Sequence, residues 1–232
     1  MKQLKFLALG AMIMLGLSGC EKTAVTSTAS VDTFIRSIKN PKDTTHVMYA
    51  AIHSVFSYNL MANSTVVTPD GETVQLTDFD KNGNSFYNAP ADSAYSLALP
   101  TLGTYKYTVT FKDKEVITYT NTLSSSSLPP PIITSLVQTV SKDSIYISWK
   151  ALSGSQAYQL KVTKGTTQVY YQPAFTDAST PPRAVLRLGF ATTLFTTYGS
   201  GVYTFEVDGM LFESTDYTYL QAIGAASKNI TL

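Results

Sequence analysis

The residues whose types and spacing most resemble a ligand site lie in the stretch DFDKNGN, which begins at Asp78. A calcium-binding hand takes oxygen ligands from alternate loop positions, with glycine at the sixth and a bidentate glutamate at the twelfth. Asp78, Asp80 and Asn82 match the first, third and fifth positions. Gly83 matches the sixth, but the twelfth position is Ala89, so the bidentate ligand is missing there.

The same stretch also has the features of a tight turn. Asn-Gly is a strong hairpin signal because both residues tolerate positive φ, and the strand-like runs VQLTDF and SFYN flank it. No helical pattern flanks it, as it would in a calcium hand. The sequence therefore favours a hairpin turn at Asn82 and Gly83 and no cofactor. A weak calcium site at Asp78, Asp80 and Asn82 is the alternative.

Aromatic side chains are the second candidate for binding chemistry, because a sugar ring can stack on an exposed flat aromatic ring. Adjacent residues of a strand point to opposite faces of a sheet. One ring of the pair Tyr170 and Tyr171, and one of the pair Phe86 and Tyr87, should therefore face outward. These four residues are the candidate ligand-binding aromatics. The plainer interpretation is that tyrosines populate sandwich surfaces, as their β propensity predicts.

The sequence contains no motif for catalysis. The two histidines, His46 and His53, are seven residues apart, which on a strand places them on opposite faces. A Gly-rich phosphate loop, a G-x-S-x-G elbow and an H-E-x-x-H motif do not occur. We therefore expect a protein that is not an enzyme and has no catalytic residues. Two carboxylates that converge between domains would instead indicate a hydrolase.

Residues 1–19 predict a lipoprotein signal peptide. Lys2 and Lys5 precede an apolar run over residues 6–17, which is shorter than the about 20 residues that a membrane-spanning helix needs. The run ends in LSGC, which resembles a bacterial lipobox. In proteins with this motif the chain is cut before the cysteine, which is then acylated. Cys20 is the only cysteine of the chain and is the predicted lipidation site.

Residues 20–30 are expected to form the lipidated cysteine and a flexible tether, because TAVTSTAS is small, polar and without apolar periodicity. Stable anchoring takes two or more acyl chains. We expect the protein to be attached through lipid on Cys20 in the bacterial cell envelope, at the outer membrane. One Glu followed by Lys after the cysteine leaves the periplasmic and the surface face both open.

Charge and composition argue against a nucleic-acid partner. Loss of Lys2 and Lys5 with the signal peptide leaves 15 basic and 16 acidic residues, so the mature net charge is −1. Charged residues make up 14% of the chain, below the usual quarter, and no basic block is present. The 15 tyrosines suit strands with one apolar and one polar face.

The periodicity predicts an all-β chain of two tandem β-sandwich domains. The stretch SSSSLPPP cannot continue a sheet ladder, because proline lacks the N–H and fixes φ, and it reads as a semi-rigid spacer. We place the domains at 31–128 and 129–232. Period-two alternation predicts strands in both halves, including residues 93–99, 103–111, 115–123, 144–149, 157–162, 168–171 and 201–207. Residues 46–60 fit helical and alternating spacing, and we expect a long strand there.

The second half resembles a fibronectin type III domain. The residues that carry this resemblance are Pro129 to Pro131 before the first strand, Trp149 in the second, YQLKV in the third, and YTFEV in the strand at the tyrosine corner. The first half looks Ig-like, with YKYTV in the equivalent place. With the lipobox, the chain resembles Bacteroidetes-type lipoproteins with tandem Ig-like and fibronectin type III-like domains. Residues 175–201 form a longer segment than that pattern has.

These observations predict a membrane-anchored, non-enzymatic binding or interaction module. The expected ligand is a glycan or a protein partner of the cell envelope, held by loops or exposed aromatic rings. The first alternative is a structural spacer that recognises no soluble ligand. The second is a hydrolase with a site between the two domains.

Overall fold

The computed structural model of the chain describes residues 26–79, 81–140, 144–176, 181–186, 196–214 and 218–232. The predicted signal peptide, Cys20 and the first part of the tether lie outside these described residues, as does Asp80.

Almost all of the regular structure in the described residues is β-strand, which confirms the all-β prediction. The strands of the first half are β1 (Ser30–Lys39), β2 (Val47–Phe56), β3 (Met61–Val67), β4 (Thr73–Gln75), β5 (Thr77–Asp78), β6 (Ser85–Asn88), β7 (Gly103–Phe111) and β8 (Val116–Leu123). Those of the second half are β9 (Ile133–Gln138), β10 (Ile145–Trp149), β11 (Ala157–Lys164), β12 (Thr167–Phe175), β13 (Arg183–Leu186), β14 (Val202–Phe212) and β15 (Leu220–Thr231).

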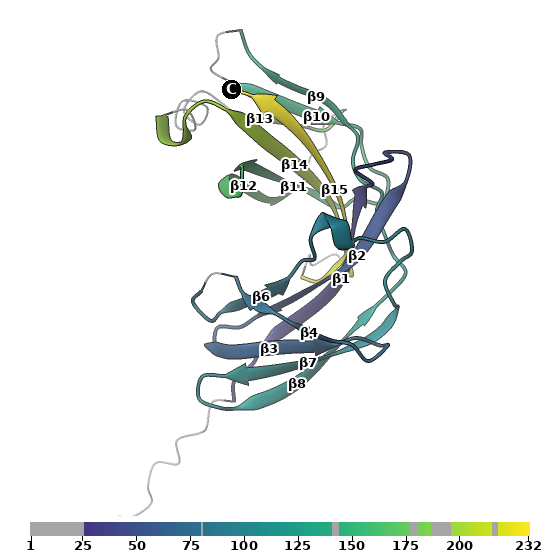
Figure 1. Cartoon of the computed structure of the whole chain (residues 1–232), viewed down its shortest axis with the longest axis vertical. Helices are drawn as coiled ribbons and strands as arrows, with labels where there is room; N and C mark the ends of the chain where they lie inside the picture. The colour runs from purple at the N-terminus through teal and green to yellow at the C-terminus, as the bar shows by residue number, and fades with distance from the viewer. Residues whose placement is uncertain (1–25, 80, 141–143, 177–180, 187–195, 215–217) are drawn as a thin grey trace, which may run out of the picture.

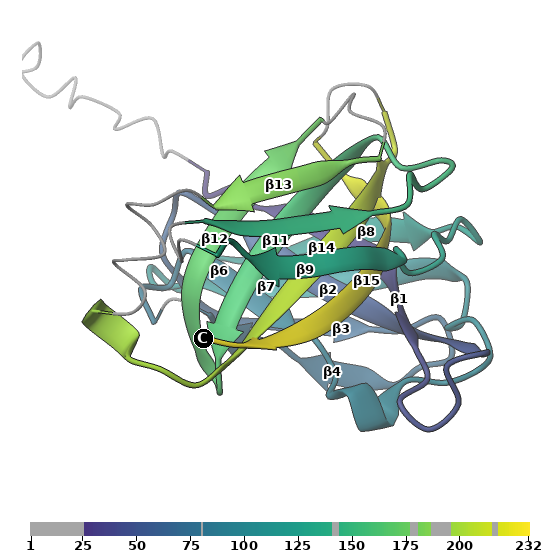
Figure 2. The same cartoon turned by 90° about the horizontal axis from the view of Figure 1, so that it is seen from above.

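The described strands form three sheets, and the largest contains strands of both halves. Its order is β12-β11-β14-β15-β1-β2-β6-β5. A second sheet, β4-β3-β7-β8, belongs to the first half, and a third, β13-β10-β9, belongs to the second. In Figure 1 the large sheet curls round, with the two smaller sheets at the bottom and top of the view. Seen from above, β9 and β13 lie across the strands of the large sheet (Figure 2).

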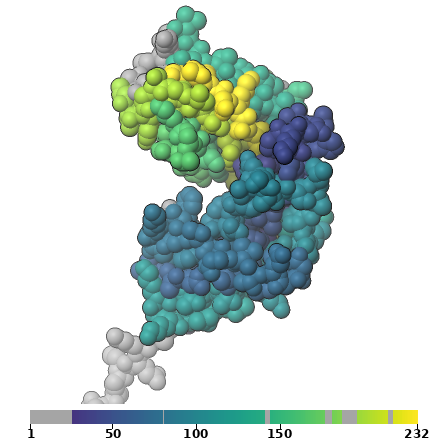
Figure 3. Space-filling view, viewed as in Figure 1, coloured from purple at the N-terminus to yellow at the C-terminus, as the bar shows by residue number. Residues whose placement is uncertain are grey.

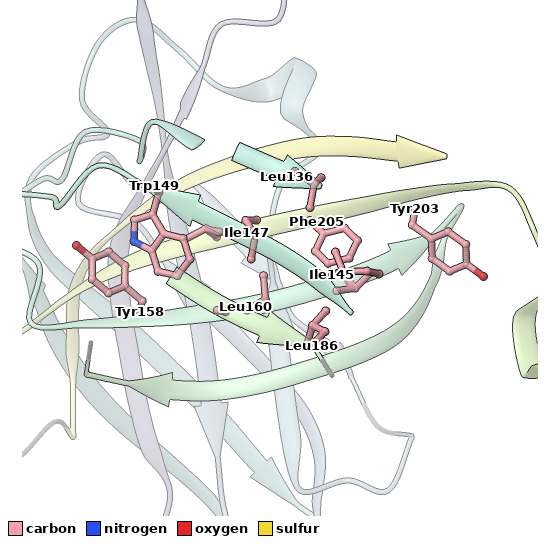
Figure 4. Packing of buried hydrophobic residues seen from close by; sticks show 12 residues of the cluster. Leu136, Ile145, Ile147, Trp149, Tyr158, Leu160, Leu186, Tyr203 and Phe205 are labelled. Carbon is pink, nitrogen blue, oxygen red and sulfur yellow. The ribbon is translucent and has the colours of Figure 1, made fainter. Parts of the chain in front are cut away.

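Each half of the chain is a β-sandwich with its own core. In the second half, the alternating residues of β10, β11 and β14 meet between the sheets (Figure 4), where Trp149, Leu160 and Phe205 are fully buried. In the first half, the core between the sheets includes Ile35 and Tyr107. Both smaller sheets pack on the same face of the large sheet. In the register that pairs β1 with β15, the β1 residues that enter the first core and the β15 residues that pack on the second core point to the same face.

Each sandwich also contains a tyrosine corner, in which a tyrosine hydroxyl donates to a backbone carbonyl a few residues upstream. The Tyr203 hydroxyl donates to the Gly199 carbonyl. In the first half, the Tyr105 hydroxyl donates to the Thr101 carbonyl over 2.7 Å. These contacts fit the fibronectin-like and Ig-like features that the sequence indicates in the two halves.

A short parallel pairing between β1 and β15 joins the two sandwiches. Only three residue pairs are in register there, among them Ile35 with Ala222 and Ser37 with Gly224. The serine–proline segment, which the sequence describes as a spacer, lies against the core side of this pairing. Leu128 is buried, and its carbonyl accepts a hydrogen bond from the Ser37 hydroxyl. The segment therefore covers the join and does not hold the sandwiches apart.

Two further expectations have clear outcomes. Residues 46–60 contain the strand β2, so the interpretation as a strand is confirmed. The strand expected at 93–99 is wrong, since that segment contains a short helix at Asp92–Ala94 and a single bridge between Tyr49 and Ser96. Prolines at 90 and 100 bound it, and proline cannot donate to a sheet ladder.

Gly224 provides a test of the join. An added Cβ would overlap the Pro129 carbonyl, whose carbon would lie 2.8 Å away. Overpacking of this kind usually costs about 1–3 kcal/mol, so we expect Gly224→Ala to lower the free energy of unfolding by about 2 kcal/mol or more in urea titrations. Ser227→Ala, on an exposed position of the same strand, is the control and should change it by less than about 0.5 kcal/mol. Equal stability of the two variants would contradict the tight contact.

Candidate functional site

The candidate site lies on the face of the large sheet that the two smaller sheets leave uncovered. This face is concave and lies between the two sandwiches, where the space-filling view shows a deep hollow (Figure 3). A pocket of about 500 Å³ opens there and takes residues from both halves. Its lining consists of Phe79, Ser85, Tyr87, Gln159, Lys161, Gln168 and Tyr171.

Strand alternation decides which of the predicted aromatic residues reach this pocket. In β6, Phe86 is buried in the core of the first sandwich, so its neighbour Tyr87 faces the pocket. In β12, Tyr170 packs against the core of the second sandwich, and Tyr171 lines the pocket with 47% of its surface exposed. The structure thus brings together one residue of each predicted pair, each from a different sandwich.

The pocket combines aromatic rings with hydrogen-bonding groups. The Phe79 and Tyr87 rings meet edge to face, with centroids 6.1 Å apart. The Tyr171 hydroxyl donates to Gln159 Oε1 over 3.3 Å. Burial raises the pKa of Tyr87 to about 12, so its hydroxyl keeps its proton at neutral pH and can act as a donor. A ligand here would meet ring faces together with amide and hydroxyl groups.

A second hollow extends the pocket along β11 and β12. It has a volume of about 740 Å³ and shares Gln159 and Tyr171 with the first pocket. Its remaining lining is mostly apolar and includes Pro173, Phe175 and Met210. Tyr171 therefore lies between two adjoining hollows, which together form one groove.

A cluster of charged residues crosses the join at the edge of the groove. Arg36 of β1 and Lys161 of β11 both contact the same oxygen of Glu206 in β14, over 3.1 Å and 2.8 Å. Arg36 also donates to the Tyr95 hydroxyl over 2.9 Å. Since Arg36 comes from the first sandwich and the other two charges from the second, this cluster ties the halves together on the concave side.

Asp208, two residues beyond Glu206 on the same strand face, is buried. Burial and the neighbouring Glu206 carboxylate raise the pKa of Asp208 well above its usual range, although Arg36 and Lys161 act in the opposite direction. Asp208 Oδ1 has no hydrogen-bond partner among the described residues. Burial of the ionised carboxyl beneath the groove therefore costs free energy, and protonation of the carboxyl relieves that cost.

Asp32 is a second, partly buried carboxyl, placed where β15 begins to run beside β1. Its Oδ2 accepts the Leu220 backbone N–H over 2.9 Å. Burial raises the pKa of Asp32 to about 7, helped by the Glu213 carboxylate and opposed by the Leu220 hydrogen bond. Near neutral pH this group therefore changes charge in the folded protein.

The stretch that begins at Asp78 forms a loop between β5 and β6, which pair as an antiparallel hairpin. The connection is longer than a two-residue turn. Asp78 Oδ2 accepts the Gly83 backbone N–H over 2.9 Å, and Asn82 Oδ1 accepts that of Asn84 over 2.9 Å. The two candidate calcium ligands inside the described range are thus engaged in holding the loop. Asp80 lies outside that range.

The histidines do not share a site. His46 is exposed, and its Nδ1 lies 2.6 Å from Asp43 Oδ2. His53 is buried in the first sandwich beside Tyr105 and Tyr107, and burial lowers its pKa to about 4. Within the described parts of the chain, no three His, Cys, Asp or Glu side chains gather as metal ligands would. Among the same residues, no helix has the length and apolar character to cross a bilayer.

Sequence reasoning missed Phe79, Ser85, Gln159, Lys161 and Gln168 as pocket residues. A signal for two of them was present, because AYQLKV alternates and its outward positions are Gln159 and Lys161. Nothing in the sequence indicated that the outward face of this strand would lie opposite β6 of the other half.

Comparisons with known proteins place this chain in no family. No family model matches it, and no curated protein does. Solved structures that it resembles include a segment of two fibronectin type III domains from chicken tenascin, at 12% identity and a TM-score of 0.28, over 78% of this chain and 92% of that one.

Two bacterial structures give similar values. The fibronectin(III)-like modules of Clostridium thermocellum CbhA share 10% identity at a TM-score of 0.28, over 88% of this chain and 94% of that one. A β-1,2-glucanase from Parabacteroides distasonis shares 12% identity at a TM-score of 0.31, over 88% of this chain but 36% of the glucanase chain. At these values the likenesses carry no argument about ligand, partner or reaction.

The raised pKa of Asp32 predicts a specific pH dependence of stability. The folded protein holds this proton more tightly than the unfolded chain, whose Asp has a pKa near 3.8. The contribution of Asp32 to stability is therefore lost as pH rises from about 4 to about 7. As pH rises through this window, we expect the free energy of unfolding of Asp32→Asn to rise relative to that of the natural protein by up to about 4 kcal/mol.

Urea titrations of both proteins at several pH values measure this difference. His53 acts in the opposite direction, because its lowered pKa makes stability fall as pH drops below about 6.5. That effect is present in both proteins and cancels in the comparison. A difference between the two proteins that does not vary with pH would show that Asp32 keeps its ordinary pKa.

Proposed function

We propose that this protein is a lipid-anchored, non-enzymatic binding module of the bacterial cell envelope, whose ligand is a glycan held in the groove between the two sandwiches. The observation that carries the proposal is the pocket with Tyr87 on one side and Tyr171 on the other. Each ring comes from a different half of the chain, so the pocket exists only in the joined molecule.

The chemistry of the pocket suits a sugar. Flat aromatic rings offer stacking surfaces for the apolar face of a pyranose, and the amides of Gln159 and Gln168 can both donate to and accept from hydroxyl groups. The volume of about 500 Å³ lies within the usual range for small-ligand pockets. The adjoining hollow past Tyr171 offers room for further sugar units.

The lining supports binding without catalysis. Glycoside cleavage needs two carboxyl groups on either side of the bond that breaks. Among the described residues that line the pocket there is no carboxylate. Two carboxyl groups lie close by, but Glu206 is paired with Arg36 and Lys161 and Asp208 is buried beneath the groove, so neither lines the pocket. These features favour a binding module over the hydrolase.

The envelope location rests on the lipobox and on Cys20, which is placed directly after the apolar run of the signal peptide. We place the anchor in the outer membrane, with the groove available to a soluble or surface-bound glycan. A protein partner in the same groove is the second candidate ligand. A spacer that binds nothing would have no use for a shared aromatic pocket.

Substitution of the two rings tests this function. We expect a soluble chain from Glu21 to Leu232 to be retarded by at least one polysaccharide of a panel in affinity electrophoresis. Tyr171→Ala and Tyr87→Ala should each weaken that retardation about tenfold, which corresponds to about 1.4 kcal/mol of lost stacking. The matched control is Tyr146→Ala, since Tyr146 is 42% exposed on β10, away from the groove.

Each outcome of this experiment decides something. Retardation that the control and the two groove variants share equally would place the glycan elsewhere. Retardation that requires added calcium would identify a metal site at Asp78, Asp80 and Asn82. Absence of retardation by every polysaccharide would contradict glycan binding and favour the protein partner or the spacer.

A further inference from the structure

An exposed apolar patch lies on the connection between β2 and β3. It consists of Phe56, Tyr58 and Leu60, and we refer to it as the β2–β3 patch. Tyr58 is 91% exposed, Phe56 44% and Leu60 46%. The Phe56 and Tyr58 rings meet edge to face, with centroids 5.1 Å apart. Single exposed apolar residues are ordinary, but three within five residues around a fully exposed ring indicate a contact surface.

The chain enters the fold directly beside this patch. The Thr28 backbone N–H donates to Asn59 Oδ1 over 3.2 Å, and the Ser57 hydroxyl donates to the Thr28 carbonyl over 2.5 Å. Asn59 and Ser57 are interleaved with the patch residues along the chain. Residue 28 is therefore fixed next to the patch, and whatever holds the chain upstream of residue 28 holds the patch as well.

Covalent geometry limits how far the patch can be from the lipid. Five residues separate Cys20 from Thr26, which makes six steps along the chain, and each step of an extended chain covers about 3.4 Å, so the reach is at most roughly 20 Å. The headgroup layer of a bilayer is itself about 5–8 Å thick on each side. A protein acylated on Cys20 must keep this end of the first sandwich within a short distance of the membrane surface.

The chemistry of the patch fits the headgroup layer of a membrane. Tyrosine rings are enriched at this depth because they combine an apolar body with a polar tip. The neighbouring turn between β7 and β8 contributes Lys112 and Lys114 together with Asp113 and Glu115. These charges balance, so the patch carries no net attraction for anionic lipid. Its contact should depend on the rings and be insensitive to salt.

We infer that the β2–β3 patch faces the membrane and rests in its headgroup layer, as a second point of attachment beside the lipid. The inference rests on the proposed anchor at Cys20. The acyl chains on Cys20 supply the attachment itself, but a flexible tether leaves the orientation of the protein free. With two points of contact, the first sandwich can no longer rotate freely about its tether. The second sandwich and the groove are then held at a fixed orientation to the membrane.

A fluorescent label at position 58 tests this inference. Cys20 is the only cysteine and is consumed by lipid, so Tyr58→Cys supplies one free thiol on the full lipidated chain. A thiol-reactive, environment-sensitive dye is attached there, and the protein is reconstituted in phosphatidylcholine vesicles. Tyr146→Cys, on the second sandwich, is the control. We expect the dye at 58 to emit at shorter wavelength and higher intensity than the dye at 146, with no reversal at high salt.

The possible results separate the inference from the anchor on which it rests. If the protein does not float with the vesicles, the anchor at Cys20 is absent and the inference falls with it. If it floats but the dye at 58 reports water as the dye at 146 does, the anchor holds and the membrane-facing patch is wrong. Loss of the wavelength shift at high salt would also overturn the inference, because it would indicate attraction by charge.

Discussion

The parallel pairing of β1 with β15 is the constraint on which the rest of this structure depends. It makes one eight-stranded sheet from strands that belong to two sandwiches, and the curl of that sheet forms the groove. Only three residue pairs carry the backbone contact, so other groups must support it. Leu128 and the prolines that follow cover its core side, while Arg36 reaches Glu206 on its concave side.

The apolar and the charged groups that support the join differ in the free energy that their burial costs. Burial of Leu128 removes apolar surface from water, which is favourable without further conditions. The charged cluster gains attraction only against the desolvation of Arg36 and Glu206, and such pairs often add little net stability. Arg36 has its charged partner on the other sandwich, so a shifted join would leave both largely buried charges unpaired. Asp208, which is buried, and Asp32, which is partly buried, lie close to the same join and indicate that this region is built for position more than for stability.

The sequence carried more information about strands than about their partners. Period-two alternation identified most strands and correctly indicated that one ring of each aromatic pair would point outward, as Tyr87 and Tyr171 do. It failed at residues 93–99, where the apolar pattern is real but the segment forms a short helix and a single bridge, and Tyr95 accepts a hydrogen bond from Arg36. It could not indicate that Tyr87 and Tyr171 share a pocket, because that depends on a pairing between strands from opposite ends of the chain.

The position of β15 at the end of the chain has a consequence for the order in which the molecule is built. The Ser37 hydroxyl and the Ile223 carbonyl, which meet at the join, are 186 residues apart. Closing a loop of that length costs about 5 kcal/mol of chain entropy before any contact is gained. Pairings between distant segments form slowly, and β15 is synthesised long after β1, its partner at the join. Until it arrives, the first sandwich has an unpaired strand edge along β1, which is the kind of edge on which other chains aggregate. The interval between the synthesis of β1 and the completion of the sheet is therefore the period in which this protein most needs protection from aggregation.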